Sequence, residues 1–343
     1  MNFVNSFGIW AKYKDNESKS PVEVHANLWH IGKNTENAFI DFGVMIPQYT
    51  NLLSLTIVLP FFVPTTNISD LSDTISQDGI GSLVFNTECV AQVKSGLGKM
   101  KIKTLCLNNS DKHILLLPII DKSTYNGISV SFNTIEEQSR IIIDFSNLKT
   151  DCEVYEKLYL RFRIRDSEIK RSMFCKLNKK NKYLESAFTG TQIIDFMVNE
   201  LRNIKAEINE MMTGEGLELV SLNKVHFFVM EPAENDVVTG DVECRRLEPG
   251  WKDYLNEGDY QENTLVYHWS RKATKEIDRF SNYSKLVKVT SSETNFKLIT
   301  IYVLIVVMLS VVASFVYSWL SCLPFWTVGV SAVVLAIILY ILS

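Results

Sequence analysis

The sequence predicts a mainly β soluble region, an antiparallel sandwich-like fold with one or two packed helices, followed by a C-terminal two-helix transmembrane hairpin. Three observations predict this fold class. Short runs rich in β-branched and aromatic residues, separated by turn residues, fill the first half of the chain. One stripe of helical spacing follows, and two long apolar runs without charge stand at the end. Outside those runs roughly 290 residues remain, enough for one large or two ordinary domains.

Residues 1–185 are expected to form an all-β sandwich-like domain. Strands are predicted over 22–31, 38–46, 52–63, 82–93, 101–107, 113–120, 128–134, 140–145, 158–165 and 173–177. Residues 53–57 and 158–164 alternate between apolar and polar side chains, which favours antiparallel pairing over a βαβ sheet. Within this region, 68–75 has the pattern of a short helix.

Residues 186–262 are expected to contribute a helix and short strands, as a second subdomain or as an extension of the first. A helix over 190–212 is predicted from one apolar stripe, formed by Ile194, Met197, Leu201, Ile204, Ile208 and Met211. The stripe is short for a coiled-coil seam, so packing on the protein's own core is favoured. Further strands are predicted over 217–220, 225–230 and 237–246.

Residues 263–296 are expected to form a basic amphipathic juxtamembrane helix. Its apolar face is formed by Val266, Trp269, Ala273, Ile277, Phe280, Ser284 and Val287. Basic side chains occupy the other face. Such a helix either transmits a displacement from the soluble region to the membrane or lies as a spacer on anionic lipid headgroups.

Residues 297–343 are expected to form the membrane hairpin. The run 298–320 has 23 residues without a charge, about 34 Å as a helix, and 325–342 has 18, about 27 Å. Both lengths match a hydrocarbon core of roughly 30 Å. Tyr317, Trp319 and Trp326 gather at the turn between the runs, as interfacial aromatic residues do. The alternative is a hairpin buried in a soluble core.

The distribution of basic residues predicts the orientation of this hairpin. Seven Lys and Arg residues precede it, namely Arg271, Lys272, Lys275, Arg279, Lys285, Lys288 and Lys297. The turn carries none, so the soluble region and both termini are expected in the cytoplasm, with the hairpin in the inner membrane. The absence of a secretory signal pattern and the singly scattered cysteines agree with a reducing compartment.

The charge and motif content narrow the functional classes. A net charge of −4 argues against bulk nucleic-acid binding. The five histidines show no metal-ligand spacing, and no catalytic constellation stands out, so neither a metal, a cofactor nor an enzyme activity is expected.

A basic row is the best candidate ligand site. Arg161, Arg163 and Arg165 alternate with apolar residues in a predicted strand, so their guanidinium groups project from one face. Tyr159 lies in line with them, and Lys170 and Arg171 follow. Such a row suits an anionic ligand, either a nucleotide-like signal or lipid headgroups, because guanidinium groups bind phosphates by paired hydrogen bonds. The alternative is a solvated sheet face whose arginines pair with carboxylates on neighbouring strands.

Within the hairpin, small residues mark a packing face or a pore. Ser310, Ser314 and Ser318 recur every four residues on the first helix. Gly329, Ala332 and Ala336 give the second helix a small-residue face. Such faces allow close helix packing, and in an assembly of hairpins the serines would line a narrow polar path.

Three functional hypotheses follow. In the first, the protein is a membrane-anchored sensor-effector: a cytoplasmic domain binds an anionic ligand or a protein partner, and the hairpins of a homo-oligomer perturb or permeabilise the lipid bilayer. Bacterial membrane-acting immune effectors share this general plan, a likeness of architecture alone that suggests antiviral defence. The second is a passive tail-anchored scaffold. The third is a membrane-tethered enzyme whose active site the sequence does not reveal.

Overall fold

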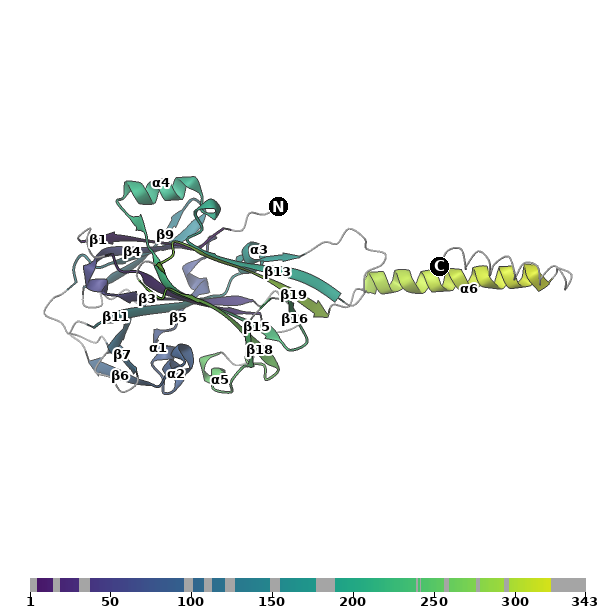
Figure 1. Cartoon of the computed structure of the whole chain (residues 1–343), viewed down its shortest axis with the longest axis horizontal. Coiled ribbons are helices and arrows are strands. Elements are labelled where there is room, and N and C mark those ends of the chain that lie inside the picture. Colours follow the sequence, from purple (N-terminus) through teal and green to yellow (C-terminus); the bar gives the residue numbers. More distant parts are fainter. Residues whose placement is uncertain are drawn as a thin grey trace. The chain divides into compact units, whose positions relative to one another are not determined.

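The computed structural model describes residues 5–14, 19–30, 38–95, 101–107, 113–120, 127–148, 155–176, 189–238, 240, 242–255, 259–275, 278–292 and 296–321. The chain divides into two compact units. The first comprises Met1–Asn178 with Thr191–Ser291, and the second comprises Lys179–Gly190 with Ser292–Ser343 (Figure 1).

A ten-stranded sheet forms the centre of the first unit. Its strand order is β17 (Glu243–Arg246), β18 (Thr264–Lys272), β15 (Leu222–Pro232), β2 (Val22–Trp29), β3 (Phe39–Pro47), β11 (Lys157–Ile164), β8 (His113–Leu116), β7 (Lys101–Leu107) and β6 (Cys89–Ser95), and β5 (Ile68–Asp70) also pairs with β11. The sheet is mixed, because β15 runs parallel to β2 and β11 runs parallel to β8.

Two smaller sheets complete the β structure. The five-stranded sheet has the order β14 (Glu218–Leu219), β1 (Gly8–Tyr13), β4 (Leu52–Val58), β10 (Gln138–Asp144) and β9 (Ser129–Ile135). The four-stranded sheet has the order β12 (Phe174–Lys176), β13 (Thr189–Val198), β19 (Tyr283–Ser292) and β16 (Asp236–Val238). The prediction of a mainly β region is therefore confirmed, with sheets of antiparallel and mixed pairing.

The main core lies between these sheets. Alternate residues of β11, such as Leu160 and Phe162, point into it and are fully buried, as are Phe42 of β3 and Ile141 of β10. Each such side chain contributes roughly 1.5–3 kcal/mol by leaving water. The rings of Phe7 and Phe42 stack with their centroids 4.6 Å apart, so the segment before β1 packs against the central sheet.

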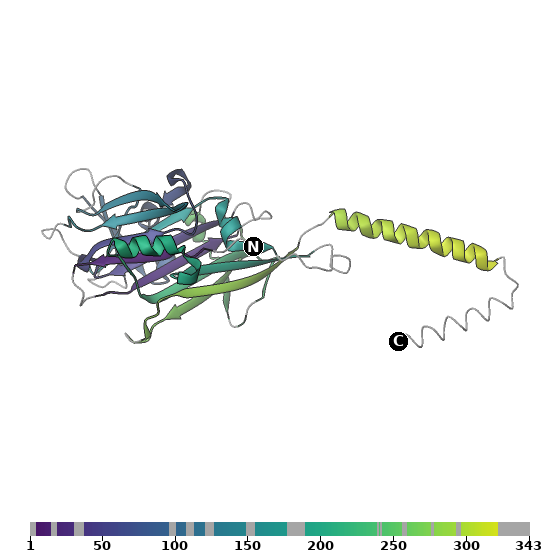
Figure 2. The ribbon, with the colours of Figure 1, turned by 90° about the horizontal axis from the view of Figure 1, so that it is seen from above.

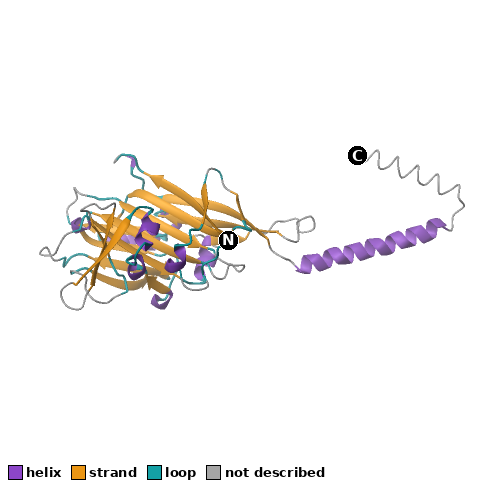
Figure 3. Ribbon diagram, turned by 90° about the horizontal axis from the view of Figure 1, so that it is seen from below, coloured by secondary structure: helices purple, strands orange, loops and turns teal. Residues whose placement is uncertain are grey.

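Short helices cover the other face of the ten-stranded sheet. These are α1 (Ser72–Ile75), α2 (Ile80–Phe85) and α5 (Trp251–Tyr254). Ile75, Ile80 and Trp251 pack with Trp29 and Phe39 of the sheet in a second apolar cluster. Figure 3 shows short helices among the strands that make up most of this unit. Both faces of the central sheet are therefore covered.

A third apolar cluster lies under α4 (Ala206–Gly214), where Ile208 and Met212 pack against Trp10 of β1. The view from above shows α4 lying across the strands of the five-stranded sheet (Figure 2). Among the described residues of the first unit, the remaining helices are α3 (Glu168–Met173) and the 3-10 helices η2 (Tyr49–Asn51), η3 (Thr65–Asn67) and η4 (Leu201–Asn203).

The predicted helix over 190–212 is wrong for most of its length. The segment forms β13 and η4, and α4 begins only at Ala206. Ile194, Phe196 and Val198 are fully buried at a spacing of two, whereas Leu201 and Met211 of the supposed stripe are exposed. The β period and the β-branched residues of this segment prevailed over a weaker helical spacing.

The predicted juxtamembrane helix over 263–296 is also wrong. This segment forms the two strands β18 and β19. Tyr267 and Trp269 of β18 enter the main core, while Val266 faces the second cluster, which is the alternation of a strand covered on both sides. Lys285 of β19 lies 5.3 Å from the ring of Trp269, so basic and apolar residues here belong to a sheet.

Smaller differences concern other short elements. The predicted strand 237–246 divides into β16 and β17, which belong to different sheets. The predicted strand 82–93 begins as helix α2, and only its second half belongs to β6. The predicted short helix over 68–75 divides into β5 and α1. Strand β1, which the sequence pattern did not single out, pairs with β4 in the five-stranded sheet.

Among its described residues, the second unit contains one candidate membrane-spanning helix. Helix α6 (Phe296–Ser321) includes the 21-residue span Ile299–Trp319, which has a mean hydropathy of 2.7. Its large apolar side chains, such as Leu309 and Phe315, are exposed. Length, composition and exposure agree with a helix that crosses a lipid bilayer. The second predicted run, 325–342, and its residues Gly329, Ala332 and Ala336 lie outside the described residues.

Candidate functional site

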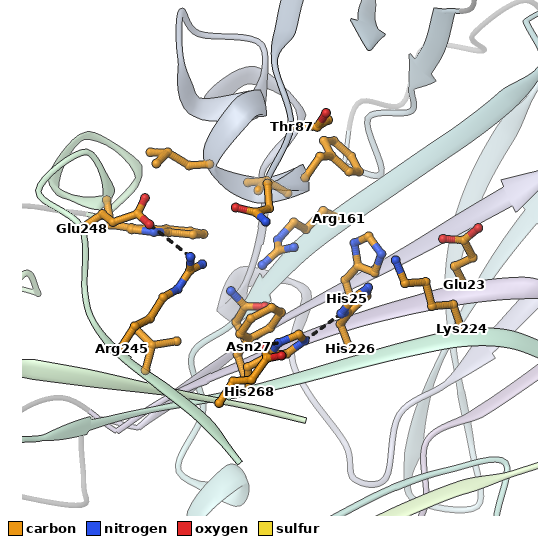
Figure 4. Close-up of a pocket in the computed structure, with 18 of the residues that line it drawn as sticks. Glu23, His25, Asn27, Thr87, Arg161, Lys224, His226, Arg245, Glu248 and His268 are labelled. Atoms are coloured by element: carbon orange, nitrogen blue, oxygen red, sulfur yellow. Dashed lines mark hydrogen bonds and ion pairs between the residues drawn. The ribbon is translucent and has the colours of Figure 1, made fainter. Parts of the chain in front are cut away.

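A cavity of about 620 Å³ opens between the ten-stranded sheet and its short helices (Figure 4). Strands β15, β2, β3 and β11 provide its floor with side chains that point away from the main core. Helix α2 and the loop after it, together with β17 and the start of α5, provide its walls. Its volume lies within the usual range for small-molecule sites, about 300–1,000 Å³.

Strand register aligns one polar row across the floor. His226 of β15 is opposite His25 of β2, which is opposite Gly43 of β3, which is opposite Arg161 of β11. A Cβ atom at Gly43 would lie 2.4 Å from the hydroxyl oxygen of Tyr159. Because position 43 has no side chain, the Tyr159 hydroxyl reaches across the row, between Arg161 and His25.

Arg161 is the buried cation of this floor, with 2% of its surface exposed. Its Nε donates to the Tyr254 hydroxyl at 2.9 Å, and Nη1 donates to the Tyr159 hydroxyl at 3.0 Å. Nη2 is buried without a hydrogen-bond partner among the described residues, and no described carboxylate forms an ion pair with Arg161. Burial disfavours the charged form, but the two hydroxyls and the more distant Asp41 outweigh it and raise the pKa of Arg161. The guanidinium therefore stays charged.

Arg163, two residues further along β11, has a different environment. It donates from Nε and Nη2 to the two oxygens of Asp41, at 2.7 and 3.0 Å. Asp41 is fully buried and also accepts from Trp29 Nε1 and from the Tyr254 hydroxyl, each at 2.8 Å. Burial alone raises the pKa of Asp41, yet the Arg163 guanidinium holds it below its usual value. Arg163 is thus neutralised inside the protein.

The rest of the predicted basic row lies outside the cavity. Arg165 pairs with Asp259 and stacks 3.9 Å from the ring centre of Phe39. Lys170 and Arg171 lie on α3, where Arg171 donates to Glu168 at 2.5 Å. Of the three arginines, Arg161 lines the cavity. Arg163 pairs with a carboxylate on the neighbouring strand β3, as the alternative interpretation expected, and Arg165 pairs with Asp259, which lies in a turn. The face is nevertheless covered, because Arg161 and Arg163 are buried.

Three histidines line the cavity beside Arg161. Nδ1 of His268 is 3.1 Å from Glu243 Oε2, and Nε2 of His268 is 2.8 Å from His226 Nδ1. Burial, with Lys224 and His268 nearby, lowers the pKa of His226 to about 3. Burial also lowers the pKa of His268, although Glu243 opposes the shift, and burial lowers that of His25 well below its usual value. All three rings are therefore neutral near pH 7.

The charged residues that line the cavity include more basic than acidic side chains. Lys157, Lys224, Arg245 and Arg246 add to Arg161, against the acidic residues Glu23, Glu243 and Glu248. Arg245 pairs with Glu248 at 3.2 Å, on the side of the cavity away from Lys224 (Figure 4). The aromatic side chains of Phe85, Phe228 and Trp251 also line the cavity. Positive charge with aromatic surface is suited to an anionic, partly aromatic ligand.

Sequence reasoning found Arg161 and Tyr159 but missed Tyr254 and the three histidines. The histidines come from β2, β15 and β18, which lie far apart in the chain and meet only through sheet pairing. A signal was present, because His25 and His226 each stand on the polar side of an alternating strand. The alternation says which side chains share a face of one strand, not which strands are neighbours.

The predicted serine row lies on one face of α6. Ser310, Ser314 and Ser318 share this face with Val307, Val311 and Phe315. Ser310 Oγ donates to the carbonyl oxygen of Val306 at 2.9 Å, so its hydrogen bond stays within the helix.

Comparisons with known proteins add no identification, because no family model matches the chain and no curated protein matches it.

Proposed function

We propose that the protein is a membrane-tethered sensor-effector whose β-rich unit binds a small anionic ligand in the cavity over Arg161. In this proposal the C-terminal hairpins of several copies then associate and perturb or permeabilise the membrane. One observation carries the ligand-binding step: a buried guanidinium without an ion-paired carboxylate on the floor of a basic cavity.

The argument from Arg161 is energetic. A charge removed from water is costly unless it is paired and fully hydrogen-bonded. Asp41 is already engaged by both oxygens with Arg163, so it does not provide a close partner for Arg161. An anion in the cavity would accept a hydrogen bond from Nη2 and supply the missing negative charge. Lys157 and Lys224 line the same cavity and would add to the attraction.

The membrane step is supported by α6 and by the sequence around it. The helix is long and apolar enough to span a bilayer. The run 325–342 would complete a hairpin, and the preceding basic residues favour a cytoplasmic position for both termini at the inner membrane. Ser310, Ser314 and Ser318 would face a neighbouring helix or line a polar path between associated copies.

The test uses full-length protein reconstituted into dye-loaded vesicles. The probe is the anion-exchange fraction of a small-molecule cell extract. We expect this fraction to increase dye release and to increase the oligomer mass in mild detergent. The Arg161→Met variant should show neither response, and Ser310, Ser314 and Ser318 changed to Leu should lose release but keep insertion.

Each other outcome has a defined meaning. Vesicles that stay tight while the fraction still binds would contradict the permeabilising step and support a passive scaffold. Release that persists in Arg161→Met would remove the cavity from the mechanism. Consumption of a molecule in the fraction would support a tethered enzyme instead.

A further inference from the structure

We propose that the ligand of this cavity is a nucleotide, held by its phosphate at Arg161 and by the edge of its base at His25 and His226. This inference rests on the proposed anion-binding function and names the chemical class of the ligand. It rests on the hydrogen bonds beside Arg161, which determine whether the free nitrogen of each histidine is a donor or an acceptor.

The hydrogen-bonding state of His226 follows from its neighbours. Glu243 accepts from Nδ1–H of His268, at 3.1 Å. A neutral His268 has then no proton on Nε2, so this nitrogen accepts from Nδ1–H of His226, at 2.8 Å. A neutral His226 in turn has no proton on its own Nε2. This atom is left as a hydrogen-bond acceptor.

The position of the proton on His25 follows from its hydrogen bond with Tyr159. Arg161 Nη1 donates to the Tyr159 hydroxyl oxygen, at 3.0 Å. Burial raises the pKa of Tyr159, so the hydroxyl keeps its proton and donates it to Nδ1 of His25, at 3.3 Å. A neutral His25 then carries its proton on Nε2, which is left as a donor.

The two histidines therefore offer one donor and one acceptor. Their ring centroids are 5.2 Å apart with the ring planes at 81°, and both residues line the cavity (Figure 4). Nucleobases present adjacent acceptor and donor groups along one edge, as in the N7 and N6 positions of adenine. A simple phosphate or a sugar phosphate has no heteroaromatic edge of this kind. The histidine pair thus points to a base rather than to an anion alone.

The remaining surfaces agree with this orientation. The Tyr159 hydroxyl forms hydrogen bonds with both Arg161 and His25, so the guanidinium is adjacent to the histidine pair. Phe85 lies against His25 and Tyr159, with ring centroids 6.0 and 4.9 Å away. Phe228 stacks on His268 at 4.2 Å. Aromatic side chains beside a cation are the surfaces on which proteins stack bases.

The experiment measures binding to full-length protein in mild detergent by calorimetry. The probes are AMP, GMP, CMP and UMP, with ribose 5-phosphate, the four nucleosides and inorganic phosphate as comparisons. We expect at least one nucleotide to bind ten times or more tightly than both ribose 5-phosphate and its own nucleoside. Equal affinity for that nucleotide and for ribose 5-phosphate would overturn the nucleotide inference but keep the anion site. If no phosphate-bearing probe binds, both proposals fail.

Two variants separate base from phosphate. His226→Leu removes the acceptor, so it should weaken the preferred nucleotide roughly tenfold and leave ribose 5-phosphate unchanged. Arg161→Met should weaken both probes. His113→Leu, a histidine of β8 that is not part of the cavity lining, is the matched control and should change neither. A His226→Leu variant with unaltered nucleotide affinity would contradict the assigned base contact.

Discussion

The two faces of the ten-stranded sheet are both buried, yet they are stabilised in different ways. On β11, Leu160 and Phe162 enter a core of apolar side chains, whereas Tyr159, Arg161 and Arg163 lie under short helices on the opposite face. The first face depends on apolar area and close packing. The second combines an apolar cluster with buried polar groups that each depend on specific partners. The comparison teaches that neighbouring buried polar residues can have different roles. Arg163 has an internal carboxylate partner, whereas Arg161 has none and can bind a ligand.

The largest expected effect is at the paired position. Arg163→Met leaves Asp41 fully buried without its guanidinium, so we expect the free energy of unfolding to fall by about 3–5 kcal/mol. Urea denaturation of the detergent-solubilised protein would measure this. Adding Asp41→Asn should recover part of the loss. A loss below about 1 kcal/mol would mean that this pair is not the main stabilising contact of the polar face.

On the apolar face, Leu160→Ala should cost about 2–5 kcal/mol, because it opens a cavity at a fully buried site. The substitution leaves the pocket-facing side chains of β11 in place. Ligand affinity should therefore be unchanged once the variant is measured at a temperature where it is folded. A selective loss of binding without a loss of stability would contradict the separation of the two faces.

At the unpaired position of Arg161 the expected change in stability is small. Arg161→Met removes a buried charge that has no ion-paired carboxylate, so the free energy of unfolding should stay within about 1 kcal/mol of the parent or increase. Ligand binding should be lost. Thermal unfolding and calorimetry on the same preparation would measure both. A destabilisation as large as that of Arg163→Met would show that Arg161 is a structural residue.

The smallest expected effect is a pH dependence of stability that comes from the cavity histidines. The pKa of His226 is lowered to about 3, below the value near 6.5 of an unfolded histidine. The unfolded state therefore binds more protons, and this contribution to stability is complete above pH 6.5 and is lost as the pH falls towards 3. His25 and His268 act in the same direction.

We expect the midpoint temperature of unfolding to be lower at pH 5.5 than at pH 7.5. His226→Leu should reduce this difference, while His113→Leu serves as the control. An identical pH dependence in parent protein and His226→Leu would show that His226 does not contribute to it.

Local sequence patterns predicted much of the sheet structure. The strand over 101–107 was predicted at its observed bounds, and most others within a few residues, because turn residues separate short β-branched runs. The failures at 190–212 and 263–296 arose where a strand buried on both sides also has an apolar residue every three or four positions. In such segments helical and β spacings overlap, and tertiary packing decides.

The candidate site was less predictable than the fold. Arg161, Arg163 and Arg165 are equivalent in the sequence, and only the positions of Asp41, Tyr254 and Asp259 distinguish them. The parallel pairing of β15 with β2, which brings His226 opposite His25, joins segments about 200 residues apart. No local pattern carries that information. The alternation of charged and apolar residues in the sequence identified the polar face of β11. The neighbouring strands determine that the cavity lies over Arg161.

The hydrogen bonds of Tyr159 with Arg161 and His25 depend on the absence of a side chain at Gly43. An alanine methyl group there would occupy the space of the Tyr159 phenol oxygen, so the ring would have to tilt away. The tyrosine would then no longer couple the guanidinium to the imidazole, although both of those side chains would be intact. A change in a residue with no functional group of its own would thus separate charge recognition from recognition of the rest of the ligand.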